Sequence, residues 1–89
     1  MTPIIAVLGE DTVKLESDFI YEFMGRGYMY TYQTVGEGQA TVEVSNDLKN
    51  WITLFDVEGT DSIVLMHPWK YQRVVDADSL EVHVLQGRY

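Results

Sequence analysis

Apolar and polar residues alternate along most of this chain, and clusters of turn residues interrupt the alternation about every 8–12 residues. Between residues 39 and 45, Ala40, Val42 and Val44 share one face, and the residues between them share the other. Such alternation is typical of a strand with one buried and one wet face. No window shows the apolar stripe of an amphipathic helix. The pattern therefore predicts an all-β chain.

The alternation divides the chain into candidate strands. They are Ile4 to Leu8, Thr12 to Leu15, Phe19 to Phe23, Tyr28 to Thr34, Gln39 to Ser45, Trp51 to Val57, Ser62 to Met66, Tyr71 to Asp76 and Leu80 to Leu85. The Gly, Asn and Asp residues at 9–11, 25–27, 36–38, 46–50 and 58–61 suit tight turns, which join strands into antiparallel hairpins. We expect one domain over residues 1–89, an antiparallel, jelly-roll-like β-sandwich of about eight short strands. Residues 1–8 and 85–89 are expected to form arms or edge strands.

Three tyrosines, Tyr28, Tyr30 and Tyr32, share one face of a predicted strand. Aromatic side chains are common in strands because they pack well across a sheet, which favours a place in the core. The alternative is an exposed aromatic platform that stacks on sugars or contacts a protein partner. The periodicity alone does not say which face points inward.

The two tryptophans stand at the edges of predicted strands, Trp51 at the start of one and Trp69 shortly before the next. Rings of this size bury about 150–250 Å², so we expect both to plug the ends of the sandwich core. The alternative is that they are exposed binding anchors. Arg73 is expected on the outer face of its strand, where it can pair with Asp56 or Glu43.

The sequence assembles no catalytic or metal-binding motif. Neither His67 nor His83 has another ligand at the spacing of a zinc site, and we expect His67 to make local hydrogen bonds. Asn46, Asp47 and Asn50 do not match a calcium loop and are expected to form Asx turns. Paired carboxylates are common among fourteen Asp and Glu, but a filled sandwich of this size leaves little room for an active-site pocket. We expect no enzymatic activity and no cofactor.

Composition narrows the choice of partners. Six Lys and Arg against fourteen Asp and Glu give a formal net charge of −8, which opposes nucleic acid and anionic lipid surfaces. No stretch approaches the roughly 20 apolar residues that cross a bilayer, and the first residues lack the basic region of a secretory signal. The absence of Cys fits a reducing cytoplasm. A domain of 89 residues has a thin core, so we expect docking or oligomerisation to supplement it.

Three segments resemble a known pattern. Residues 44–54 (VSNDLKNWITL) and 68–74 (PWKYQRV) resemble the turn-plus-tryptophan pattern of small β-sandwich virion proteins of tailed bacteriophages, and residues 25–34 resemble the strand that enters the same module. The family's turn carries a glycine where this chain has Leu48, which leaves the turn type open. The resemblance implies a virion structural protein, made in the host cytoplasm. It would be of the head decoration or cement type, which binds and stabilises the assembled head.

The partners that the resemblance implies are the major capsid protein or other virion proteins, with homo-oligomers or lattice-bound copies of the chain. Two alternatives stay open, a carbohydrate-binding β-sandwich module and a small tail or connector adaptor. The terminal segments are expected to act as arms because unpaired strand edges recruit partner strands. The residues expected to bind a partner are Ile4, Ile5, Tyr28, Tyr30, Tyr32, Trp69, Arg88 and Tyr89.

Overall fold

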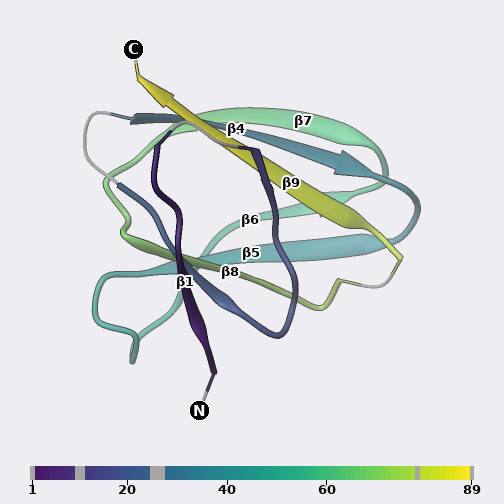
Figure 1. The fold of residues 1–89 in the computed structure, drawn as a ribbon. Coiled ribbons are helices and arrows are strands. Elements are labelled where there is room, and N and C mark those ends of the chain that lie inside the picture. The colour runs from purple at the N-terminus through teal and green to yellow at the C-terminus, as the bar shows by residue number, and fades with distance from the viewer. Residues whose placement is uncertain (1, 10–11, 25–27, 78, 89) are drawn as a thin grey trace.

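The computed structural model of the chain describes residues 2–9, 12–24, 28–77 and 79–88. Within these ranges the chain forms strands and no helix (Figure 1). The strands are β1 (Ile4–Ala6), β2 (Thr12–Lys14), β3 (Ile20–Glu22), β4 (Tyr28–Val35), β5 (Gln39–Ser45), β6 (Ile52–Glu58), β7 (Asp61–Met66), β8 (Tyr71–Val75) and β9 (Glu81–Arg88). Each predicted segment overlaps one of them, and the all-β sandwich is confirmed.

The strands form two sheets that pack face to face (Figure 1). One sheet has the order β1, β3, β8, β5, β6, and the other has the order β2, β9, β4, β7. The chain from β2 to β9 pairs as a long hairpin: β5 with β6, β4 with β7, β3 with β8 and β2 with β9, all antiparallel. Successive pairs belong alternately to the two sheets, which is the strand order of a jelly roll.

β1 adds a strand to this jelly roll. It pairs in parallel with β3, with Ile4 opposite Ile20. Parallel neighbours need a long connection, and here the connection passes through β2 in the other sheet. β1 lies at the edge of the five-stranded sheet, and its parallel pairing is a feature that the sequence pattern does not predict. Residues 85–88, expected as an arm or edge strand, belong instead to β9, which lies between β2 and β4 in the other sheet.

The core lies between the two sheets and contains the inward-facing side chains of both. Val42 in β5 and Val84 in β9 are fully buried, and so are Tyr30 and Tyr32 in β4. The core interpretation of the tyrosine row is therefore confirmed, and Tyr28 packs against the core as a partly buried residue. The platform interpretation is wrong because β4 lies between β9 and β7, with its tyrosine face covered by the other sheet.

The tryptophans lie outside the core cluster, so the expectation that they plug the sandwich is wrong. Both Trp51 and Trp69 are half-buried. The guanidinium of Arg73 lies 4.0 Å from the centre of the Trp51 ring. Because the residues on either side of Arg73 point into the core, this contact is on the outer face of the five-stranded sheet. Arg73 also pairs with Glu43 at 2.7 Å, as predicted.

Candidate partner-binding surfaces

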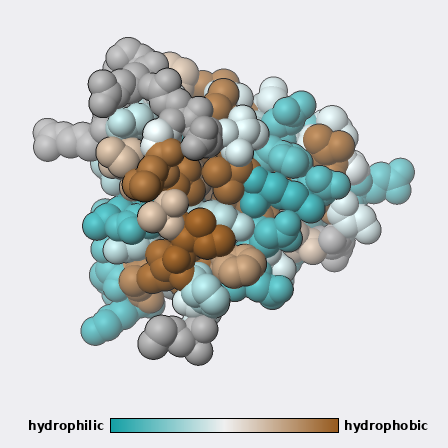
Figure 2. Space-filling view, viewed as in Figure 1, coloured by the Kyte–Doolittle hydropathy of each residue, from teal (hydrophilic) through white to brown (hydrophobic). Residues whose placement is uncertain are grey.

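β1 exposes apolar side chains on both of its faces. Ile4 and Ile5 point in opposite directions, yet they are 46% and 39% exposed. Leu8, just beyond the strand, is 72% exposed. Hydrophobic side chains gather on the face of the molecule that carries β1 (Figure 2). Because β1 is an edge strand that buries neither face well, it is available to a partner.

An open hollow of about 590 Å³ adjoins β1. It is lined by Thr2, Pro3, Ile4, Ile20 and Leu48, so four of its five lining residues are apolar. Leu48 comes from the loop between β5 and β6 and has a φ of 64°, in the left-handed region. A leucine costs about 1–2 kcal/mol in this region, which glycine adopts freely. The turn therefore has a residue in the left-handed region, as a turn with glycine would, but here that residue is a strained leucine.

Hydrogen bonds inside the β5–β6 loop hold Leu48 in this conformation. The Ser45 hydroxyl accepts the Leu48 N–H at 3.0 Å. The Asp47 carboxylate accepts the N–H groups of Lys49 and Asn50 at 2.9 and 2.8 Å. The N–H of Asn50, followed by its side-chain amide, holds the pKa of Asp47 well below its usual range. The predicted Asx turn is confirmed, and it fixes the position of the Leu48 side chain beside the hollow.

β7 is an edge of the four-stranded sheet, and it carries no charge from Ser62 to Met66. On its outer face, Val64 and Met66 are 58% and 59% exposed. On its inner face, Ile63 and Leu65 pack against the core but are only partly buried. Both faces of this edge therefore present apolar surface.

β6 lies on the same flank of the sandwich, because only Gly59 and Thr60 separate it from β7. Its residues Leu54 and Phe55 pack against the core and are also only partly buried. Ile52, at the other end of β6, is exposed. The core is thus incompletely covered along the β6–β7 flank.

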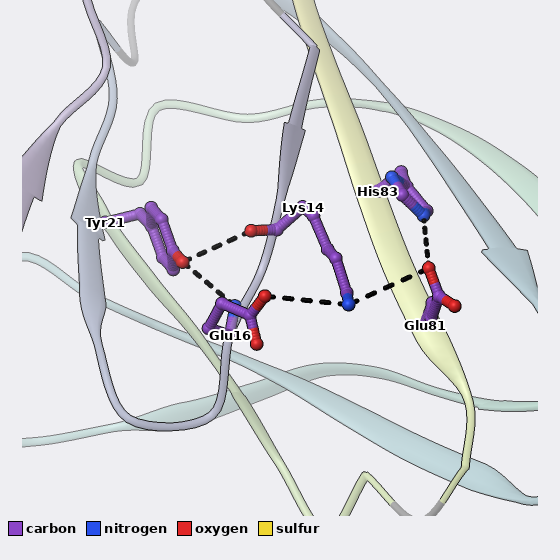
Figure 3. Close-up of polar contacts among 5 residues, drawn as sticks. All are labelled: Lys14, Glu16, Tyr21, Glu81 and His83. Carbon is purple, nitrogen blue, oxygen red and sulfur yellow. Dashed lines mark hydrogen bonds and ion pairs between the residues drawn. The ribbon is translucent and has the colours of Figure 1, made fainter.

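β2 forms the opposite edge of the four-stranded sheet, and charged side chains surround it (Figure 3). The Lys14 ammonium lies 3.6 Å from Glu16 and 3.8 Å from Glu81. The Tyr21 hydroxyl accepts the Glu16 N–H at 2.9 Å and donates to the Lys14 carbonyl at 3.2 Å. His83 lies 3.2 Å from the same Glu81 carboxylate. A short strand with an exposed lysine is protected against pairing with another chain.

A line of hydrogen bonds anchors the corner that follows β7. The Trp69 N–H donates to His67 Nδ1 at 3.2 Å, which places the proton of the neutral imidazole on Nε2. His67 Nε2 then donates to the Tyr32 hydroxyl at 3.0 Å, and this hydroxyl donates to Gln72 Oε1 at 2.5 Å. Burial lowers the pKa of His67 to about 4, so the ring is neutral at pH 7. The prediction of a hydrogen-bonding His67 is confirmed.

The structure separates the residues that the sequence analysis grouped as partner-binding. Ile4 and Ile5 lie exposed on β1, whereas Tyr30 and Tyr32 are buried and cannot contact a partner in this fold. Tyr28 and Trp69 are half-buried. The Arg88 side chain, Tyr89 and the turn residues 10–11 and 25–27 lie outside the described residues.

Sequence analysis missed two features of these surfaces. The sequence pattern showed Leu48 only as a departure from the family's glycine, although a leucine at that turn position already indicated a strained residue. The uncharged run from Ser62 to Met66 was identified as a strand, but its place at a sheet edge depends on pairings between distant segments. That place makes the run a candidate binding surface.

Within the described ranges, no group of three His, Asp or Glu side chains is placed to hold a metal ion. The same ranges contain no helix long and apolar enough to cross a membrane. No protein-family model matches the chain, and no curated protein or solved structure matches it.

Proposed function

We propose that the chain is a non-enzymatic structural protein of a tailed-bacteriophage virion, which docks on the assembled head as a decoration or cement protein. Its partner is the major capsid protein or another virion protein. The hollow beside β1 supports this proposal, since Ile4, Ile20 and Leu48 form an apolar surface there that the described chain leaves open.

The strained backbone at Leu48 is the main observation in favour of a docking surface beside β1. Strained backbone conformations gather at functional sites, because elsewhere a less strained residue would serve. Here a glycine would satisfy the turn, and the leucine instead adds apolar surface next to β1. The exposed Ile5 and Leu8 extend the apolar character of the same edge. Exposed apolar surface of this kind is better explained by docking to a partner than by packing within the chain.

A docking protein of this size binds a lattice through many copies, each with a small interface. Many weak contacts across a lattice add through avidity. A protein that binds the assembled shell better than free subunits stabilises the shell by mass action. A tail or connector adaptor would use the same surface with a different partner. The carbohydrate-binding alternative has less support, because burial of Tyr30 and Tyr32 removes its stacking platform.

The test begins with purified virions of the phage that carries the chain, in which mass spectrometry counts its copies. Heads stripped of the chain are then mixed with purified variants and sedimented. We expect Leu48→Gly to weaken binding about tenfold or more, because it removes apolar contact area. Its free energy of unfolding should stay unchanged or rise by up to about 1 kcal/mol, because glycine relieves the left-handed strain.

Two exposed isoleucines at opposite edges of the five-stranded sheet give a matched control. Ile4→Ser should weaken binding to heads, and Ile52→Ser should not. Absence of the chain from purified virions would overturn the virion role. Equal binding by the two variants would overturn the assignment of the docking surface to β1.

A further inference from the structure

We propose that β7 pairs with β7 of a second copy of the chain, in antiparallel register about a two-fold axis through Val64. The dimer is independent of the virion role, because a different edge of the molecule carries it. β1 and β7 belong to different sheets, so one copy can use both surfaces.

The backbone of β7 is available for this pairing. Among the described strands, β4 is its one neighbour, so the other side of β7 has no strand beside it. β7 has six residues and is therefore about 20 Å long. Between Ser62 and Met66 it has no charge and no proline, the usual protections of an edge strand. A long, apolar, unprotected edge is a template for another strand.

The alternation of side chains selects the register. Residues directly opposite each other in an antiparallel pair point to the same face of the sheet. An axis through Val64 sets Ser62 opposite Met66 and Ile63 opposite Leu65, so outward residues meet outward ones and inward residues meet inward ones. A slip of one residue would mix the two faces. This register also uses the whole uncharged run.

The same pairing covers apolar core residues that stay partly exposed in a single copy. Ile63 and Leu65 on β7, with Leu54 and Phe55 on β6, are core residues that remain partly exposed along this flank. In the dimer they lie next to the equivalent residues of the second copy. Burial of this apolar surface supplies the main driving force for association.

Charge favours the antiparallel orientation. The end of the flank at the β6–β7 hairpin is acidic, with Asp56, Glu58 and Asp61. The other end adjoins the β5–β6 loop, where Lys49 and Asp47 carry opposite charges, so this end is near neutral. Antiparallel pairing sets each acidic end beside the near-neutral end of the other copy, whereas parallel pairing would set acid against acid.

Light scattering on the purified chain tests the dimer directly. We expect wild type to have twice the chain mass of 10.2 kDa. Val64→Lys should be a monomer, with a dissociation constant raised about 30-fold or more, because two lysines would meet at the axis. The side chain is exposed, so thermal unfolding should confirm an intact fold. Leu85→Lys, on the outer face of β9, is the matched control and should stay dimeric.

Engineered cysteines test the register, since the chain has no Cys of its own. Val64→Cys would place two thiols on strands whose paired Cα atoms are about 4.5–5.5 Å apart, which a disulfide can span. Oxidation should give a covalent dimer. Ser62→Cys mixed with Met66→Cys should give a cross-linked heterodimer. Leu85→Cys is the control that should not cross-link.

Three results would overturn the proposal. The first is a wild-type monomer at the highest concentration that can be reached. The second is a dimer that Val64→Lys leaves intact, because such a dimer must use another surface. The third is cross-linking of Val64→Cys at the same rate as Leu85→Cys, because the axis would then lie elsewhere.

Discussion

The two edges of the four-stranded sheet differ in how they are protected. β2 is three residues long, and its Lys14 lies between two glutamates. β7 is six residues long, and it is uncharged from Ser62 to Met66. Both edges expose backbone groups that can pair with another chain. The difference indicates that β2 stays unpaired, whereas β7 is available to a partner.

Two leucines near these edges differ in burial. Leu15, which follows β2, is buried, whereas Leu65 in β7 is only partly buried, as is Val13 within β2. The core is therefore closed at Leu15 and open at Leu65. The same substitution at the two leucines measures this difference directly.

The largest expected effect is that of Leu15→Ala. It should lower the free energy of unfolding by about 3 kcal/mol, because it leaves a cavity in a closed part of the core. Leu65→Ala should cost about 1–2 kcal/mol in dilute solution, because less of its side chain is buried. Urea unfolding at two protein concentrations measures both. The cost of Leu65→Ala should grow with concentration if β7 pairs, and equal, concentration-independent costs would remove the contrast between the edges.

Tyr32→Phe tests the hydrogen bonds at the corner after β7. It removes the hydroxyl that joins His67 to Gln72, and it leaves the buried Gln72 Oε1 without its hydrogen-bond donor. We expect a loss of about 2 kcal/mol in urea unfolding. Adding Gln72→Leu should recover part of this loss, because both polar partners are then gone. No recovery in the double variant would contradict this account.

Lowering the pH should loosen the same corner. The pKa of His67 is about 4 in the folded chain and about 6.5 in the unfolded chain, so the unfolded state binds the extra proton between these values. Stability is therefore complete above about pH 6.5 and falls as the pH drops toward 4. Because the ring is partly solvated, we expect this loss to be about 1–2 kcal/mol.

Urea midpoints along the pH range, compared between wild type and His67→Gln, isolate the contribution of the histidine from that of the carboxylates. The variant should lose less stability than wild type between about pH 6.5 and 4. Identical pH profiles would show that His67 does not set this slope.

The smallest effect on stability is expected for Lys14→Val. Its ion pairs are exposed, so the free energy of unfolding should change by less than about 0.5 kcal/mol. The variant nevertheless removes the charge from β2, and light scattering should detect species larger than those of wild type. Asp18→Val, which removes a charge from the exposed loop between β2 and β3, is the control. An unchanged mass for Lys14→Val would mean that the short length of β2 suffices to protect it.

Local features of this fold were predictable from the sequence. Strand positions follow from the alternation of side chains, and turns follow from the residues that tolerate or require special backbone angles. The Asp47 turn belongs to this group, because its partners lie in one loop. The partner of Arg73 does not, because the pattern left Asp56 and Glu43 open and the pairing of β5 with β8 selects Glu43.

The burial of the aromatic residues was not predictable in the same way. Alternation places Tyr30 and Tyr32 on one face of β4. The same alternation would be seen whether that face pointed to the core or to solvent. The tryptophans were expected in the core because of their size, and the structure places Trp51 against Arg73 on the outer face instead. Size alone does not say which surface a ring covers.

The sequence by itself determined the strands, their turns and the all-β class, because each depends on residues close together in the chain. Only the tertiary structure decided which strands became edges, since the pairing of β2 with β9 and of β1 with β3 joins distant segments. An apolar strand between two neighbours is part of a core, and the same strand with one neighbour is a binding surface. The candidate surfaces at β1 and β7 follow from that difference.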